Sequence, residues 1–232
     1  MKPGAMAQGF AALVLAACAS GPPPPDWQLE SHGALAAFER HWFAGNTPAA
    51  EIEYARAQAG VARTGRLELA ARVELARCAL LAASLDFRPC AGFEALRADA
   101  LPGDRAYAAF IAGHWSALEN AALPAPYRAL VAPGADAAAA LVAIESPRSR
   151  LVGAASLLRA NRLSPAGIEV AVETASAQGW RRPLLAWLGL QLRRAEAAGA
   201  AEDAARLRRR IDLVLGAPDE TSKPGGASLR AR

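Results

Sequence analysis

The amino-acid sequence predicts an all-α fold of stacked antiparallel helix pairs, and three observations favour it. Hydrophobic residues make up 53% of the 232-residue chain, and alanine supplies many of them, which suits closely packed helices with few large side chains. No stretch alternates β-branched with polar residues, and no Asn-Gly or Asp-Gly hairpin turn occurs. Helix-breaking residues recur at helical-hairpin intervals. One helical domain over residues 27–216 is the simplest organisation.

Capping signals mark where several helices begin. Asn46-Thr47-Pro48, Ser146-Pro147 and Ser164-Pro165 each place a polar capping side chain before a proline, and proline is well tolerated in the first helical turn. With the glycines that fall at expected helix ends, these signals predict helices over residues 27–44, 48–63, 66–85, 91–99, 104–121, 125–131, 135–144, 147–160, 165–178, 182–198 and 201–215.

Apolar periodicity distinguishes an inner helix from a terminal one. The segment 66–85 carries two apolar stripes, one of Leu69, Val73, Ala76 and Leu80 and one of Leu67, Ala71, Cys78 and Leu85. A helix with two apolar faces packs between neighbours. The segment 201–215 carries a single stripe of Ala204, Leu207, Ile211 and Val214, as expected of a helix that ends an array.

The amino terminus carries an export signal. Lys2 supplies a positive charge, Gly9 to Ala17 form an apolar segment too short to span a bilayer, and the segment ends in Leu15-Ala16-Ala17-Cys18. This ending resembles the lipobox of bacterial lipoproteins. The resemblance implies cleavage after residue 17, acylation of Cys18 and stable anchoring by several acyl chains. A plain signal peptide with a chance cysteine is the alternative.

Two flanking segments complete the predicted organisation. Residues 18–26 hold the acylated cysteine and a tether, because the run Pro22 to Pro25 favours an extended polyproline conformation. Ala19 and Ser20 follow the cysteine where lipoproteins retained in the inner membrane often carry aspartate, so the resemblance implies transport to the outer membrane. Residues 217–232 are rich in proline and glycine and are expected to be a disordered tail.

Two helix pairs resemble tetratricopeptide repeats. Segments 48–85 and 182–215 each contain a helix, a turn with Gly65 or Gly199, and a second helix with Ala70 or Ala204 five residues later. The resemblance implies an α-solenoid that binds peptides or partner proteins.

Cysteine usage predicts one disulfide. If lipid takes Cys18, the remaining pair is Cys78 and Cys90, and exported chains commonly join such a pair. The turn at 86–89 returns the chain toward the helix that carries Cys78. Two buried free thiols are the alternative.

Catalytic and cofactor signals are sparse. No HExxH, GxSxG or glycine-rich phosphate motif is present, and His32, His41 and His114 do not form a metal-site pattern. Glu145-Ser146 with the following Gly153-Ala154 resembles the start of a lytic transglycosylase motif, in which the glutamate is a general acid, but the spacing is too short. The sequence therefore predicts no catalytic residue, no metal and no cofactor.

The net charge and the predicted export together reduce the number of possible partner classes. The net charge of +4 and the exported address make nucleic acid an unlikely partner, and no small-molecule substrate is evident. The arginine pairs near the carboxyl end fit either a solvated face or an anionic surface. We expect an outer-membrane-anchored periplasmic lipoprotein that is not an enzyme and binds another envelope protein. The alternatives are a peptidoglycan-acting enzyme or its activator, and a structural lipoprotein.

Overall fold

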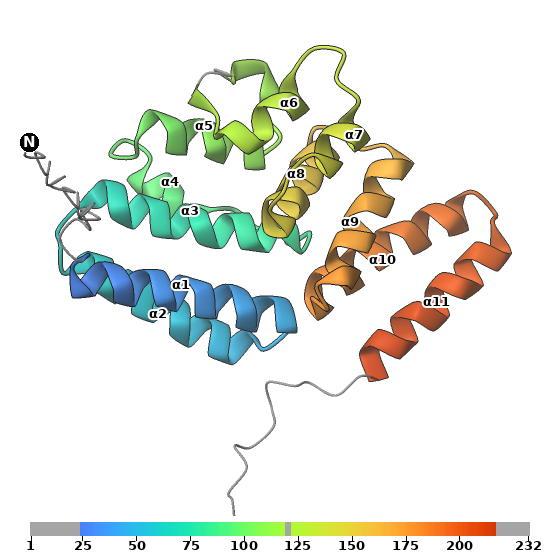
Figure 1. The fold of residues 1–232 in the computed structure, drawn as a ribbon, viewed down its shortest axis with the longest axis horizontal. Helices are drawn as coiled ribbons and strands as arrows, with labels where there is room; N and C mark the ends of the chain where they lie inside the picture. Colours follow the sequence, from blue (N-terminus) through green and yellow to red (C-terminus); the bar gives the residue numbers. More distant parts are fainter. Residues whose placement is uncertain (1–23, 119–121, 217–232) are drawn as a thin grey trace, which may run out of the picture.

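The computed structural model describes residues 24–118 and 122–216, and every regular element within them is helical (Figure 1). The predicted signal peptide, Cys18, the tether as far as Pro23 and the tail at 217–232 lie outside these residues. The all-α prediction is confirmed. None of the described helices is long and apolar enough to cross a membrane.

The longer helices are α1 (Asp26–Ala44), α2 (Thr47–Ala62), α3 (Leu67–Ala83), α5 (Pro102–Ile111), α8 (Pro147–Arg159), α9 (Pro165–Ala177), α10 (Arg181–Ala197) and α11 (Ala201–Gly216). The short elements are α4 (Ala91–Leu96), α6 (Arg128–Val131), α7 (Ala137–Val142) and two 3-10 turns, η1 (Trp115–Ala117) and η3 (Ala125–Tyr127).

The three capping signals mark real helix starts. The Asn46 side chain accepts a hydrogen bond from the Ala49 amide at 3.2 Å and begins α2. Ser146 Oγ accepts from the Ser149 amide at 3.3 Å and begins α8. Ser164 begins α9 in the same way, with 3.2 Å to the Gly167 amide. Each cap satisfies an amide that lacks an intrahelical partner.

The predicted helix over 104–121 is wrong in its second half. Helix α5 ends at Ile111, and the chain continues into the short turn η1. The cause is Gly113, which adopts a left-handed φ of 77°. Its amide donates to Phe110 O at 2.9 Å, and the His114 amide donates to Ala109 O at 3.0 Å, the pattern that closes a helix at a glycine.

The predicted helix over 91–99 is also shorter than expected. Helix α4 ends at Leu96, and the amides of Asp99 and Ala100 both donate to the Leu96 carbonyl at 3.1 Å. This turn closes the helix before the chain enters α5. The helix expected over 125–131 is divided into η3 and α6, and the remaining predicted boundaries lie within two residues of the observed ones.

Helix α3 is the inner helix that its two apolar faces predict. It packs against α2, α4, α5 and α8, and Figure 1 shows it between the α1–α2 pair and the helices that follow it. Helix α11 packs against α10 through the buried side chains of Ala204 and Leu207, while its arginines Arg206 and Arg209 are exposed. This agrees with a single apolar stripe.

Trp187 and Arg182 of α10 contact the amino-terminal helices. Trp187 of α10 is fully buried and its Nε1 donates to the Ala83 carbonyl at the end of α3, at 3.0 Å. Arg182 lies with its guanidinium carbon 3.7 Å from the centre of the Trp42 ring, and its Nη2 donates to Gly45 O at 3.0 Å. Helix α10 therefore contacts both α1 and α3, although more than a hundred residues separate α10 from either contact in the sequence.

Candidate functional site

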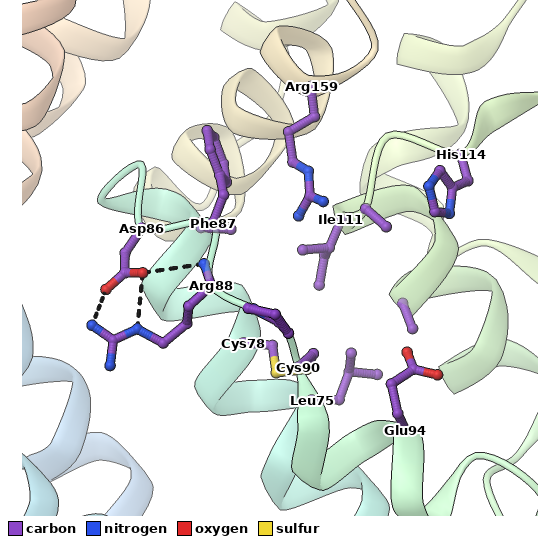
Figure 2. A pocket seen from close by; sticks show the side chains of 14 residues that line it. Leu75, Cys78, Asp86, Phe87, Arg88, Cys90, Glu94, Ile111, His114 and Arg159 are labelled. Carbon is purple, nitrogen blue, oxygen red and sulfur yellow. Dashed lines mark hydrogen bonds and ion pairs between the residues drawn. A yellow bond between two sulfur atoms is a disulfide. The ribbon is translucent and has the colours of Figure 1, made fainter.

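A cavity of about 310 Å³ lies where α3, the loop at 86–90, α4, α5 and the end of α8 meet (Figure 2). This volume is at the lower end of the range of ligand-binding pockets. Apolar side chains supply much of the lining: Leu75, Ala82, Phe87, Pro89, Ala108, Ile111 and Ala112. Polar side chains complete it: Asp86, Arg88, Glu94, His114 and Arg159. The cavity thus offers an apolar surface beside charged groups.

The Cys78–Cys90 pair lies in the wall of this cavity. The structure brings the two sulfur atoms to disulfide distance, with 5.9 Å between the Cα atoms. Leu85 makes the return of the chain possible, because it adopts a left-handed φ of 57° and lets the Asp86 amide donate to Leu81 O at 3.0 Å. The turn that the sequence predicts therefore places Cys90 against α3.

We predict that this pair is oxidised to a disulfide. Mass spectrometry of unreduced protein should find one linked peptide joining residues 78 and 90. The pair is separated by 12 positions, and closing a loop of that length stabilises by about 3 kcal/mol in the chain-entropy model. The double variant Cys78→Ser, Cys90→Ser should lose a comparable amount in denaturant titration. Complete alkylation of both thiols without reductant would refute the disulfide.

Gly113 brings α8 close enough to complete the cavity. A Cβ atom at this position would lie 2.8 Å from Arg159 Cβ and 2.9 Å from the Arg159 carbonyl carbon. No larger residue fits without moving backbone, and the left-handed φ also favours glycine. The same residue turns the chain so that His114 faces the cavity. Gly113 thus positions both His114 and Arg159.

Two ion pairs neutralise most of the charge in the lining. Arg88 Nη2 lies 2.6 Å from Asp86 Oδ2, and both residues come from the 86–90 loop. Burial raises the pKa of Asp86, but the hydrogen bonds from Arg88 outweigh it and leave that pKa below its ordinary value. Arg97 Nη2 lies 2.6 Å from Glu94 Oε1. This hydrogen bond, helped by the charge of His114, lowers the pKa of Glu94.

Arg159 differs from the other charged residues of the lining. Its guanidinium carbon lies 5.2 Å from the centre of the Phe87 ring, and no carboxylate within the described residues forms an ion pair with it. Partial burial lowers the pKa of Arg159, because desolvation disfavours the charged form. In Figure 2 its guanidinium points into the space that His114 and Glu94 also face. Arg159 is therefore a cation of the lining that has no ion pair within the described residues.

Only some of the candidate residues from the sequence lie at the cavity. Cys18 lies outside the described residues, whereas Cys78 and Cys90 lie together in the cavity wall. Glu145 is exposed and does not line the cavity, and Ser146 beside it caps α8. His32 and His41 lie on α1, away from the cavity. Within residues 24–118 and 122–216 there is no group of three or more His, Cys, Asp or Glu that could hold a metal.

Sequence reasoning missed Phe87, Gly113 and Arg159. Phe87 lies in a loop and Arg159 is one arginine among many, so neither has a distinctive pattern. Gly113 had a recognisable signal, since a glycine inside a predicted helix often marks its end. Comparison of the chain with protein-family models, with curated proteins and with solved structures finds no match.

Proposed function

We propose that this chain is an outer-membrane-anchored periplasmic lipoprotein whose helical domain is a non-enzymatic module for binding another envelope protein. The sequence Leu15-Ala16-Ala17-Cys18 supports the anchor. The observation that carries the binding role is the cavity beside the Cys78–Cys90 pair. Its lining combines an apolar surface with one uncompensated arginine, and such a combination suits an inserted side chain with a neighbouring polar group.

The helix pairs support the same role. Helices α2 and α3 contact each other, as do α10 and α11, and their connecting turns contain Gly65 and Gly199 with left-handed φ values of 65° and 68°. We propose that these pairs are stacked in the manner of tetratricopeptide repeats. In addition, α3 contacts α8, α8 and α10 both contact α9, and α1 contacts α10, so these helices would join the two pairs into one array.

The function is tested by photocrosslinking in living cells. A photoreactive amino acid at Glu94, which is exposed and lines the cavity, should give one discrete adduct with an envelope protein. The same amino acid at Arg209, exposed on α11, is the matched control and should not give that adduct. Adducts at both positions, or at neither, would contradict docking at the cavity.

A second variant links the adduct to the cavity itself. Ala112→Phe places a large side chain in the lining and should abolish the Glu94 adduct, because the space is filled. Ala197→Phe on the exposed end of α10 should leave the adduct unchanged. An adduct that survives Ala112→Phe would show that the partner binds elsewhere.

A further inference from the structure

Among the arginines that line the cavity, Arg159 is available to recognise a ligand. Asp86 with Arg88 and Glu94 with Arg97 form ion pairs whose closest N–O distances are both 2.6 Å. Arg159 is the remaining arginine of the lining, and within the described residues it stacks near the Phe87 ring and forms no ion pair. The cavity is therefore complementary to an anion next to Arg159.

The position of Arg159 leaves its guanidinium accessible to an anion in the cavity. The guanidinium carbon lies 5.2 Å from the centre of the Phe87 ring, and the planar N–H groups point into the cavity (Figure 2). A guanidinium binds a carboxylate with two parallel hydrogen bonds, which are stronger than those between neutral groups.

The apolar lining specifies what the anion is attached to. Leu75 and Ile111 lie in the same cavity as Arg159, so a ligand that fills it carries an apolar group close to its anionic group. The volume of about 310 Å³ is small. The last residue of a polypeptide meets both needs, because one residue then bears the carboxylate and the apolar side chain. An internal Asp or Glu would need a second residue for the apolar group, and the chain would have to leave the cavity in both directions.

We propose that the cavity binds the carboxyl terminus of a partner protein that ends in an apolar residue, with Arg159 binding the terminal carboxylate. The proposal rests on the proposed binding function and specifies the part of the partner that is recognised. Phe87 holds the guanidinium in place, and Gly113 allows the close approach of α8 that places Arg159 at the cavity. His114 faces the same space and offers a second hydrogen-bond donor.

The test uses detergent-solubilised full mature protein and a fluorescent tripeptide, Ala-Ala-Leu with a free carboxyl end. Fluorescence polarisation should show saturable binding. Amidation of the peptide's carboxyl end should weaken binding at least about tenfold, as expected for loss of a charge-assisted pair. Arg159→Gln should weaken binding of the free acid equally but leave the amide unaffected. Arg162→Gln is the matched control, because Arg162 lies over Trp115 at 4.7 Å and does not line the cavity.

Three results with peptides would overturn the proposal, and a fourth with N-acetyl-leucine would do so as well. These are equal binding of the acid and the amide, no binding of either, and equal binding of an amidated peptide that carries an internal aspartate before leucine. Equal binding of the amidated peptide with an internal aspartate would assign the site to an internal acidic segment. If N-acetyl-leucine alone binds as tightly as the tripeptide, the site belongs to a free small carboxylate, and the carboxyl-terminus proposal also fails.

The two proposals can fail separately. A Glu94 adduct that persists in Arg159→Gln would retain the partner-binding function and reject the role of the terminal carboxylate. Tripeptide binding that depends on Arg159, without any adduct in cells, would retain the chemistry of the site and reject an envelope-protein partner. Circular dichroism of Arg159→Gln checks its folding, and the comparison of acid with amide needs no variant at all.

Discussion

Replacing Trp187 with alanine should lower the free energy of unfolding by about 3–5 kcal/mol, the range typical of a large aromatic removed from a core. The indole is fully buried and its Nε1 donates to Ala83 O at 3.0 Å. This carbonyl is in the last turn of α3, where carbonyls lack intrahelical partners. The substitution leaves both a cavity and an unsatisfied carbonyl between α10 and α3. Such a loss is a large share of the stability of an ordinary domain.

Two further variants separate the causes of that loss. Trp187→Phe keeps most of the buried ring but removes the donor, so it should cost about 1–3 kcal/mol, the desolvation penalty of an unpaired polar group. Trp27→Ala, at a half-buried position at the start of α1, should cost clearly less than Trp187→Ala. Denaturant titration followed by far-ultraviolet circular dichroism measures all three. A loss below about 1 kcal/mol in Trp187→Ala would contradict the burial that the structure gives this residue.

Replacing Cys18 with serine should abolish lipidation of the protein completely. The thiol is the nucleophile that takes up diacylglycerol in proteins with a lipobox, and a hydroxyl does not replace it in that reaction. A fatty-acid probe should label the wild-type chain and leave Cys18→Ser unlabelled. Because stable anchoring needs more than one acyl chain, the mature part of the variant should also be lost from the outer-membrane fraction of a density gradient.

The matched control is Cys78→Ser, which removes a cysteine of the cavity wall and should be lipidated like the wild type. Normal labelling of Cys18→Ser by the fatty-acid probe would show that the predicted lipobox is wrong. Labelling that disappears in Cys18→Ser, with wild-type protein found in the inner-membrane fraction, would keep the anchor and reject the outer-membrane address.

Local sequence signals were sufficient for most helix boundaries. The caps at Asn46, Ser146 and Ser164 act through hydrogen bonds to amides three residues away, so the residues that decide them are neighbours in sequence. The same is true of the disulfide-distance pair, since the turn after Leu85 lies within the short loop between the two cysteines. The end of α5 at Gly113 could also have been predicted, because a glycine inside an expected helix often marks its end.

The site itself was decided by tertiary structure. Arg159 lies at the cavity only because α8 packs against the turn at Gly113, and Phe87 covers its guanidinium from a loop more than seventy residues earlier. Likewise, Trp187 donates a hydrogen bond to the Ala83 carbonyl of α3, which lies more than a hundred residues earlier in the sequence. In the sequence these are an ordinary arginine, a loop phenylalanine and a helical tryptophan. Caps and turns depend on near neighbours and can be predicted from the sequence, whereas the cavity and its unpaired charge arise from packing between distant helices.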